Sequence, residues 1–463
     1  MPSRQTPDNP FLTAPPGRLF LSNAAPIVFV MVMSGLLSII DAAFLGLYVG
    51  PRAVAAIGLI FPALMLFIAL STLVGSGMSS LYARRLGAGE VSAAASVFAS
   101  AHGLALTVAV IVILLIGLLA KPLVTLAAGG DDEVAAMALT FLRIAALATP
   151  VQFLLGLHID ALRNEGRAAI LAPLSVGTTL ANIALNYLLI VQADLGVAGS
   201  ALGTAMAQVL AFAIVLGLRA RGGRVPLSAL MRHSWVGGWG RILGLGAPVS
   251  LSFIGIAFVS TCVLSALSAY AGPAYLQTVA AYGIVIRLIG FAWLPMMGMA
   301  LAMQSVVGNN VGAGLLQRSD AVLRIALVSV LVYCAGVEIV FLAGASVIGG
   351  WFVSDAAVAA EVGRILPRMT ALYLVIGPVL IFALYFQTIG QPKRTSLLTL
   401  AKPFLLQPVL IVLLSTIFGE PGIWIAVPMA DLVVAVIAVL LFLKLRGPRP
   451  GFGFSPAMRE VRA

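Results

Sequence analysis

Long apolar stretches recur along the whole chain, and each is able to cross a lipid bilayer. A helix rises about 1.5 Å per residue, so roughly 20 apolar residues span the hydrocarbon core of a membrane. Twelve such stretches leave no room for a separate soluble domain, and we therefore predict an all-α polytopic membrane protein with twelve transmembrane helices. The predicted spans are 21–48, 54–83, 91–120, 134–161, 168–191, 197–219, 242–270, 276–307, 320–350, 364–389, 396–418 and 421–445.

The composition excludes an ordinary soluble protein. Hydrophobic residues make up 61% of the 463 and charged residues 9%, whereas soluble domains are about a quarter charged. The net charge of +11 could point to nucleic acid, but most Lys and Arg lie on alternate connections, including Arg84, Arg219 and Lys402, and most loop acids lie on the opposite ones. This is the positive-inside pattern. We therefore predict a multi-pass protein of the cell inner membrane with cytoplasmic N- and C-termini and no nucleic-acid partner.

The second half of the chain repeats landmarks of the first half. Pro26 has a counterpart in Pro248, 222 residues later, and Gly87-Ala88-Gly89 recurs as Gly312-Ala313-Gly314, 225 residues later. Transporter folds are often built from such repeats. Six spans in each half give both repeats the same orientation, so we predict two six-helix lobes related by a pseudo-two-fold axis along the membrane normal. The predicted parts are a cytoplasmic N-terminal tail (1–20), an N-terminal lobe (21–219), a cytoplasmic linker (220–241), a C-terminal lobe (242–445) and a cytoplasmic tail (446–463).

Four polar residues lie at a similar depth within predicted spans of the first half. Leaving an ionised side chain in hydrocarbon costs at least about 2.5–3.5 kcal/mol, so an embedded acid is a functional candidate. Asp41 lies roughly 12 Å inside the outer end of the first span. Asn182 and Asn186 are one turn apart on the fifth span, and Thr204 is on the sixth. One carboxylate with neutral oxygens suits a sodium ion, or a carboxylate that gains and loses a proton. The alternative is that Asn and Thr only join helices by hydrogen bonds.

Other embedded residues have weaker claims to a role. Glu338 is alone in the middle of the ninth span, where a gating role competes with that of a buried acid hydrogen-bonded to a neighbouring helix. Met65 and Met206 could line a substrate cavity because thioethers adapt to varied apolar ligands, and helix packing is the alternative. Arg287 is expected to be a structural partner of an acid or a carbonyl, with Asp431 as one candidate.

Motifs in both halves resemble the multidrug and toxic compound extrusion (MATE) exporters, and the resemblance covers nearly all of the chain. The motifs are Ser38-Ile39-Ile40-Asp41, Gly87-Ala88-Gly89, Arg287-Leu288-Ile289-Gly290-Phe291 and, as the most specific, Val307-Gly308-Asn309-Asn310-Val311-Gly312-Ala313-Gly314. The resemblance implies a two-lobed antiporter that expels organic cations in exchange for protons or sodium ions. It also implies that Asp41, Asn182, Asn186 and Thr204 form the cation site of the N-terminal lobe. Spans seven and ten lack the acids of the NorM-like branch, so the chain looks more like the DinF-like branch.

We therefore expect a secondary active multidrug exporter that works by alternating access, with ion coupling through Asp41. Pro26 lacks a backbone N–H and could let the first helix bend as Asp41 changes charge. We expect a small organic cation as substrate, H+ or Na+ as coupling ion, no cofactor, no enzymatic activity, and a monomer in the lipid bilayer. His102 and His158 have no metal-ligand companion at helical spacing and are expected to be packing residues. The alternative function is a lipid-linked saccharide flippase of a related two-lobed family.

Overall fold

The computed structural model describes residues 9–353 and 355–445, and within these ranges the chain is helical without a strand. Eleven helical segments are long and apolar enough to cross a membrane, and a bent pair of shorter helices makes a twelfth. The prediction of an all-α membrane protein with twelve spans is thereby confirmed. The predicted tail at 446–463 and the first eight residues of the predicted N-terminal tail lie outside the described residues.

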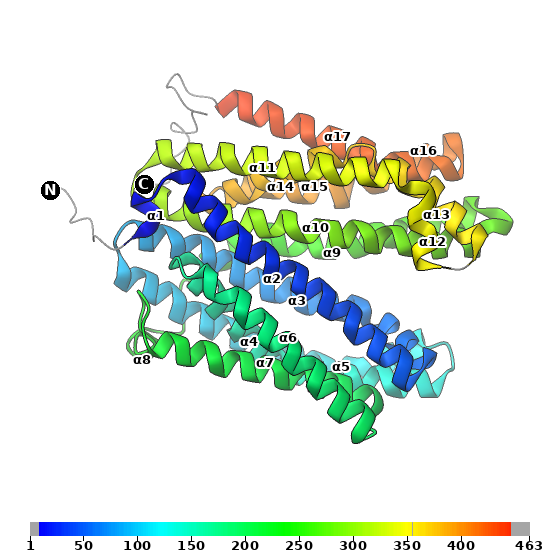
Figure 1. Cartoon of the computed structure of the whole chain (residues 1–463), viewed down its shortest axis with the longest axis horizontal. Helices are drawn as coiled ribbons and strands as arrows, with labels where there is room; N and C mark the ends of the chain where they lie inside the picture. Colours follow the sequence, from blue (N-terminus) through cyan, green and yellow to red (C-terminus); the bar gives the residue numbers. More distant parts are fainter. Residues whose placement is uncertain (1–8, 354, 446–463) are drawn as a thin grey trace. The chain divides into compact units, whose positions relative to one another are not determined.

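The helices belong to two compact units (Figure 1). The first unit contains Ala25–Ser250 with the segments up to Ala14 and Gly308–Gly314, and the second contains the remainder. Helices that lie wholly or mostly in the first unit are α1 (Pro10–Thr13), α2 (Pro16–Phe44), α3 (Pro51–Gly87), α4 (Val91–Ala127), α5 (Asp132–Asn164), α6 (Leu171–Asn186), α7 (Gly196–Ala220) and α8 (Ala229–Arg232). Those of the second unit are α9 (Trp239–Tyr270), α10 (Tyr275–Gly312), α11 (Leu316–Ala343), α12 (Ala345–Phe352), α13 (Ala356–Thr370), α14 (Tyr373–Thr388), α15 (Pro392–Ala401), α16 (Gln407–Phe418) and α17 (Glu420–Leu445).

Helix starts follow capping residues and prolines. Pro51 stands at the start of α3, where its missing N–H has no partner to lose. Asp131 caps α5 by accepting a hydrogen bond from the backbone N–H of Val134 at 3.1 Å, and Asp355 caps α13 in the same way. The connections at these caps are short, so consecutive spans run in opposite directions.

The ninth and tenth predicted spans differ from the observed helices. The ninth does not continue to residue 350, because α11 ends at Ala343 and the short helix α12 begins after Gly344. The tenth is not one straight helix, since α13 and α14 meet at an angle of 48°. Hydropathy does not register such a bend, because it records composition along the chain and not the direction of a helix.

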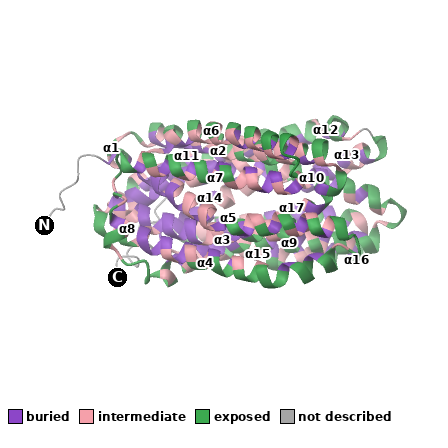
Figure 2. Cartoon of the chain, turned by 90° about the horizontal axis from the view of Figure 1, so that it is seen from below, coloured by how far each residue is buried: buried purple, intermediate pink, exposed green. Residues whose placement is uncertain are grey.

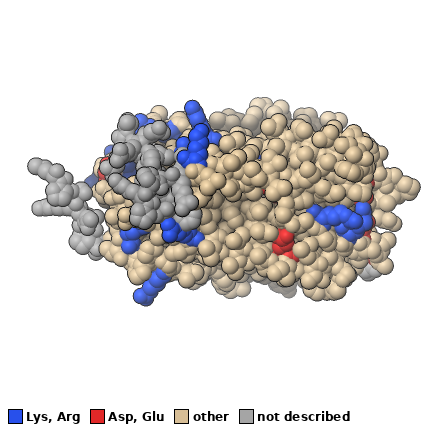
Figure 3. Space-filling model, turned by 90° about the horizontal axis from the view of Figure 1, so that it is seen from above, with Lys and Arg blue, Asp and Glu red and all other residues tan. Residues whose placement is uncertain are grey.

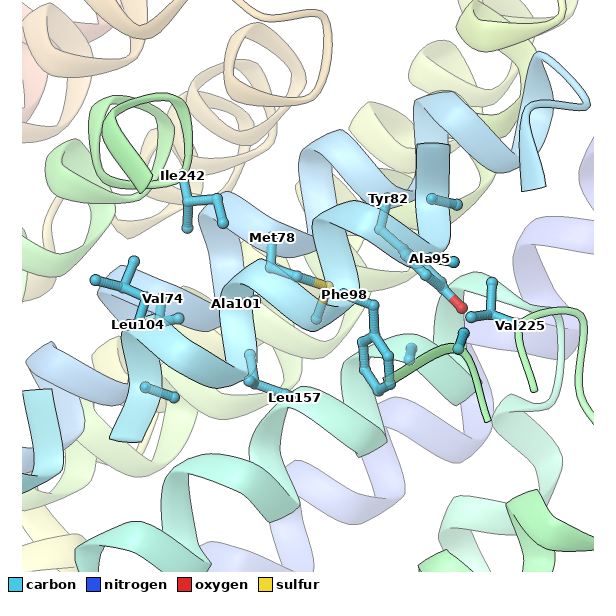
Figure 4. Packing of buried hydrophobic residues seen from close by; sticks show 14 of the residues in the cluster. Val74, Met78, Tyr82, Ala95, Phe98, Ala101, Leu104, Leu157, Val225 and Ile242 are labelled. Atoms are coloured by element: carbon cyan, nitrogen blue, oxygen red, sulfur yellow. The ribbon is translucent and has the colours of Figure 1, made fainter. Parts of the chain in front are cut away.

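A buried core in the first unit joins α3, α4 and α5 (Figure 4). Met78 and Tyr82 of α3 pack with Phe98 of α4 and Leu157 of α5, and the rings of Tyr82 and Phe98 have centroids 5.8 Å apart. Because lipid tails are as apolar as these side chains, close packing contributes more than exclusion from water to holding such helices together.

Two glycines of the repeated Gly-Ala-Gly motif allow the ends of α3 and α10 to touch. A Cβ on Gly87 would stand 1.9 Å from the carbonyl oxygen of Asn309, and a Cβ on Gly312 would stand 2.0 Å from that of Arg84. The neighbour is backbone in both cases and has little freedom to withdraw. A close contact between the backbones of α3 and α10 therefore requires glycine at both of these repeated positions.

Apolar side chains cover much of the molecular surface, as a bilayer demands. Figure 2 shows exposed residues along the length of helices such as α4 and α16. Leu118 and Leu126 of α4 are 73% and 80% exposed. On the face shown in Figure 3, Lys and Arg lie toward the ends and the stretch between them is nearly free of charge. Single exposed apolar residues are ordinary on soluble proteins, but a continuous apolar band of this kind indicates contact with lipid.

Candidate ion-coupling site

The four polar residues predicted at one depth come together in the first unit. Asn186 on α6 donates its amide Nδ2 to Oδ1 of Asp41 on α2 at 2.7 Å and to Oδ1 of Asn182 at 3.1 Å. Asn182 in turn donates Nδ2 to Oγ1 of Thr204 on α7 at 3.2 Å. One chain of hydrogen bonds therefore connects α2, α6 and α7, with Asp41 at its end.

The backbone next to this site departs from the α-helix in two of the three spans. The π-helix η1 (Leu45–Val49) begins four residues after Asp41, and the π-helix η3 (Tyr187–Gln192) begins directly after Asn186. Such segments are rare and occur frequently at functional sites. The local geometry thus singles out the same residues as the side-chain contacts do.

A glycine on the third helix sets the distance to Asn186. A Cβ on Gly203 of α7 would stand 2.3 Å from Oδ1 of Asn186, so this amide fits only because Gly203 has no side chain. The same Oδ1 is buried and has no hydrogen-bond partner. An unpaired buried carbonyl oxygen is unfavourable, and it provides an acceptor that a change in the site can satisfy.

The site is buried on the amide side and more open on the carboxylate side. Asn182 and Asn186 are 1% and 0% exposed, whereas Asp41 and Thr204 are only partly buried. Oδ1 of Asp41 accepts from Asn186, and within the described part of the chain Oδ2 has no partner. A proton can bind Oδ2 without disturbing the hydrogen-bond chain. A sodium ion would also need the oxygens of Asn182 or Thr204, which now accept hydrogen bonds.

A model of the MatE family matches residues 26–188 and again residues 248–413, once in each half of the chain. The chain belongs to the MATE family. Because members of this family are transporters, the prediction that the chain is not an enzyme is confirmed.

Relatives and solved structures match the chain over nearly its whole length. The multidrug export protein MepA of Staphylococcus aureus is 24% identical over 440 residues, which cover 94% of this chain and 95% of MepA. MepA of Staphylococcus saprophyticus is 25% identical over 427 residues, with 91% and 92% covered. A crystal structure of MATE in complex with MaL6 superposes with a TM-score of 0.86 at 22% identity, covering 94% of this chain and 98% of that one. A MOP superfamily transporter from Pyrococcus furiosus gives a TM-score of 0.86 at 22% identity, with 95% and 97% covered. These structures share the MATE fold with this chain.

Of the other first-half candidates of this MATE chain, Pro26 and Met206 lie on helices of the site, whereas Met65 lies on α3. Pro26 is inside α2, ten residues from its start, and Met65 is partly buried on α3. Met206 on α7 is 48% exposed. It follows Thr204 by two residues, and residues at that spacing do not share a helix face. The roles suggested for these three residues stay predictions.

Glu338 meets the bend of the tenth span in the second unit. Its carboxylate is buried on α11 and accepts a hydrogen bond from the backbone N–H of Leu374 at 2.8 Å, in the first turn of α14. The expectation of a buried acid bonded to a neighbouring helix is confirmed. A helix start has unpaired N–H groups, and Glu338 satisfies one of them.

The suggestion that Arg287 pairs with Asp431 is wrong, because Asp431 accepts from Lys402 and Arg287 is exposed on α10. The placement of Lys402 in a cytoplasmic segment is also wrong. Lys402 begins a π-helix, η5 (Lys402–Leu406), inside the apolar span Pro392–Phe418. Asp431, on the next span α17, compensates the charge of Lys402. No pattern along the sequence predicts this pairing.

Sequence reasoning missed a buried charged cluster around Glu165. Arg219 of α7 forms an ion pair with Glu165 at 3.2 Å, and the hydroxyl of Tyr82 donates to the same carboxylate at 2.5 Å. The guanidinium of Arg219 also lies 4.8 Å from the ring centre of Phe98. The signal that could have found the cluster is the single acid in the basic connection between Arg163 and Arg167.

His102 of α4 and His158 of α5 lie side by side, although they are far apart in the sequence. Their Nε2 atoms are 3.1 Å apart, and both rings are buried beside Phe98. In the described ranges, no group of three or more His, Cys, Asp or Glu is arranged to hold a metal ion. The two histidines pack against aromatic rings as predicted, and they form a pair that was not foreseen.

Proposed function

We propose that this chain is a secondary active multidrug exporter that expels organic cations in exchange for protons. The observation that carries the proposal is the carboxylate of Asp41, held by Asn186 at 2.7 Å within an apolar span of a MATE-family chain. Full-length relatives named multidrug export proteins support the substrate class. We place the protein in the plasma membrane, with both termini in the cytoplasm, on the basis of its charge distribution.

The exchange of an organic cation for a proton follows because both compete for the carboxylate of Asp41. When Asp41 is ionised, its half-open side attracts an organic cation, and when Asp41 is protonated, that attraction is lost. Each ligand favours the conformation in which it binds more tightly, and only this difference in affinity can shift the conformational equilibrium. Alternating exposure of the site to the two sides of the membrane then links outward movement of the cation to inward movement of a proton.

The hydrogen-bond pattern favours a proton over sodium as the coupling ion. Oδ2 of Asp41 is open to protonation, whereas oxygens that sodium would need already accept hydrogen bonds from Asn182 and Asn186. A protonated Asp41 also becomes a donor. The proton on Oδ2 leaves Oδ1 as the acceptor from Asn186, so the hydrogen-bond chain persists in both protonation states.

Pro26 offers a place for α2 to respond to this change. A proline inside a helix removes one backbone hydrogen bond and permits a bend. Solved MATE structures with TM-scores of 0.85 and 0.84 to this chain have been described in a straight and in a bent conformation. We propose that α2 of this chain bends at Pro26 when Asp41 takes up a proton.

Proteoliposomes that hold the purified protein test the proposal, with ethidium as substrate and with proton or sodium gradients imposed separately. We expect ethidium transport with the proton gradient alone, and a loss of about tenfold or more in Asp41→Asn, which corresponds to about 1.4 kcal/mol of lost interaction. Asp194→Asn is the matched control, because Asp194 is exposed and has a φ of 50° that Asn also tolerates. Wild-type transport by Asp41→Asn would contradict the role of this carboxylate.

Several cationic groups embedded in the membrane would support the rival function, which is the flipping of lipid-linked saccharides. In the described spans of the second unit, the exposed Arg287 and the paired Lys402 are candidates. Transport of ethidium by the purified protein would support the export of organic cations. Movement of a labelled lipid-linked saccharide between leaflets, with no transport of ethidium, would favour the flippase.

A further inference from the structure

A second embedded charge pair lies in the second unit, away from Asp41. Lys402, the first residue of η5, donates a hydrogen bond to Oδ1 of Asp431 on α17. Lys402 is ten residues from the start of its span at Pro392, and Asp431 is eleven residues from the start of α17 at Glu420. By helical rise both lie roughly 15 Å from the respective ends, so the charges meet deep in the membrane.

Lys402 and Asp431 lie on the second-half counterparts of the helices that hold Asn182, Asn186 and Thr204. The eleventh and twelfth spans correspond to the fifth and sixth, whose polar side chains connect to Asp41 in the first unit. Gly390, after the tenth span, lies 224 residues beyond Gly166, which follows the fourth span. With this offset, Lys402 corresponds to the position one turn before Asn182, and Asp431 to the position one turn after Thr204. The second half thus places polar groups of its own on the equivalent pair of helices.

The backbone at Lys402 resembles the backbone at the first site. The described residues contain three π-helical segments, of which two follow Asp41 and Asn186 and the third begins at Lys402. Helix α9 packs closely here, since a Cβ on Gly255 would stand 2.6 Å from the side chain of Pro403. Three rare segments beside the embedded polar groups of both halves support a functional role for the third.

The chemistry of the pair is suited to an anionic group. A quarter of the Lys402 side chain is exposed, whereas 6% of the Asp431 side chain is. Asp431 is the one hydrogen-bond partner of Lys402 within the described chain, so two ammonium hydrogens remain available. The hydroxyl of Tyr373, in the same unit, is also buried without a partner. An ammonium exposed to lipid is expensive, so a subsite at Lys402 requires the exposed part of this side chain to face water.

We propose that Lys402, backed by Asp431, is a substrate subsite in the second unit that takes the carboxylate of a transported molecule. The ammonium of Lys402 attracts a carboxylate, which the carboxylate of Asp41 would repel. A substrate that carries a carboxylate can therefore bind in the second unit. This proposal rests on the proposed export function.

Rhodamine B and its ethyl ester provide matched probes, because they differ in the free carboxylate. Lys402→Met combined with Asp431→Asn removes both charges and leaves no unpaired charge in the membrane. We expect binding of rhodamine B to the purified protein to weaken about tenfold or more, and binding of the ester to stay within about twofold of wild type. Equal weakening of both probes, or no weakening of either, would overturn the subsite.

Exchange of the two residues separates binding from structural support. Lys402→Asp with Asp431→Lys restores an internal ion pair but moves the ammonium to the buried position. We expect rhodamine B binding to remain weak in this variant, and wild-type binding of both probes would show that the pair only holds the helices together. Proton-driven transport of the ester is measured separately. Its absence in wild type would refute the export function, whereas the binding comparison still decides the subsite.

Discussion

Replacement of Gly203 by alanine should break the hydrogen-bond chain at Asp41 without removing any polar group. The added Cβ would stand 2.3 Å from Oδ1 of Asn186 and 3.3 Å from its Cγ. Ordinary contact between heavy atoms begins near 3.5 Å, so the amide must withdraw by about 1 Å. Asn186 is fully buried and bonds both Asp41 at 2.7 Å and Asn182 at 3.1 Å. A displacement of this size cannot preserve both bonds.

The expected effect on transport follows from the bonds that are lost. A hydrogen bond to a charged group contributes about 1.5–3 kcal/mol, so loss of the bond to Asp41 should reduce proton-driven ethidium export by roughly 10- to 100-fold. Strain from the extra methyl adds a fold-stability cost of about 1–3 kcal/mol. Abundance in the membrane and thermal stability in detergent must therefore be measured beside transport in proteoliposomes.

Gly217→Ala is the matched control for this substitution. Gly217 is on the same helix, and no heavy atom lies within 4 Å of the position of its Cβ. Alanine is a better helix former than glycine, so we expect wild-type transport and equal or slightly higher stability. The double variant Gly203→Ala/Asn186→Ala relieves the clash and should recover stability while export stays low.

Two results would refute this reasoning about Gly203. Wild-type export by Gly203→Ala would show that the close contact does not position Asn186. Recovery of export in the double variant would show that coupling does not need the amide of Asn186. In either case the bond between Asn186 and Asp41 would be a structural contact between helices.

Two further predictions concern helix contacts outside the site. Glu338→Ala leaves the N–H of Leu374 without its acceptor and should destabilise the protein by about 1–3 kcal/mol, whereas Glu338→Gln keeps an acceptor and should lower the melting temperature less; equal effects of both would argue against the helix-capping role. Gly312→Ala drives a methyl to 2.0 Å from the carbonyl oxygen of Arg84 and should reduce abundance in the membrane strongly, while Gly117→Ala, with open space around its Cβ, should not; similar abundance of the two variants would contradict the close contact.

The sequence was sufficient for the twelve spans, because a membrane-crossing helix satisfies its own backbone hydrogen bonds and needs only a run of apolar residues. It also pointed to Asp41, since an acid among apolar residues is expensive wherever the helix packs. The internal repeat was visible through Gly87 and Gly312, and the structure adds the reason, a reciprocal backbone contact. These properties depend on the identity and spacing of residues along one chain segment.

Partners and directions were decided only by the tertiary structure. Asp431 pairs with Lys402, which was expected in a cytoplasmic segment, and not with Arg287, which was expected in a span. The 48° bend between α13 and α14 and the buried pair of Glu165 and Arg219 likewise depend on how helices pack. Hydropathy and spacing describe a helix by itself, whereas the energy of a buried charge depends on whichever group a distant helix brings within about 3 Å. That distance is a property of the packed molecule, and no pattern along the chain contains it.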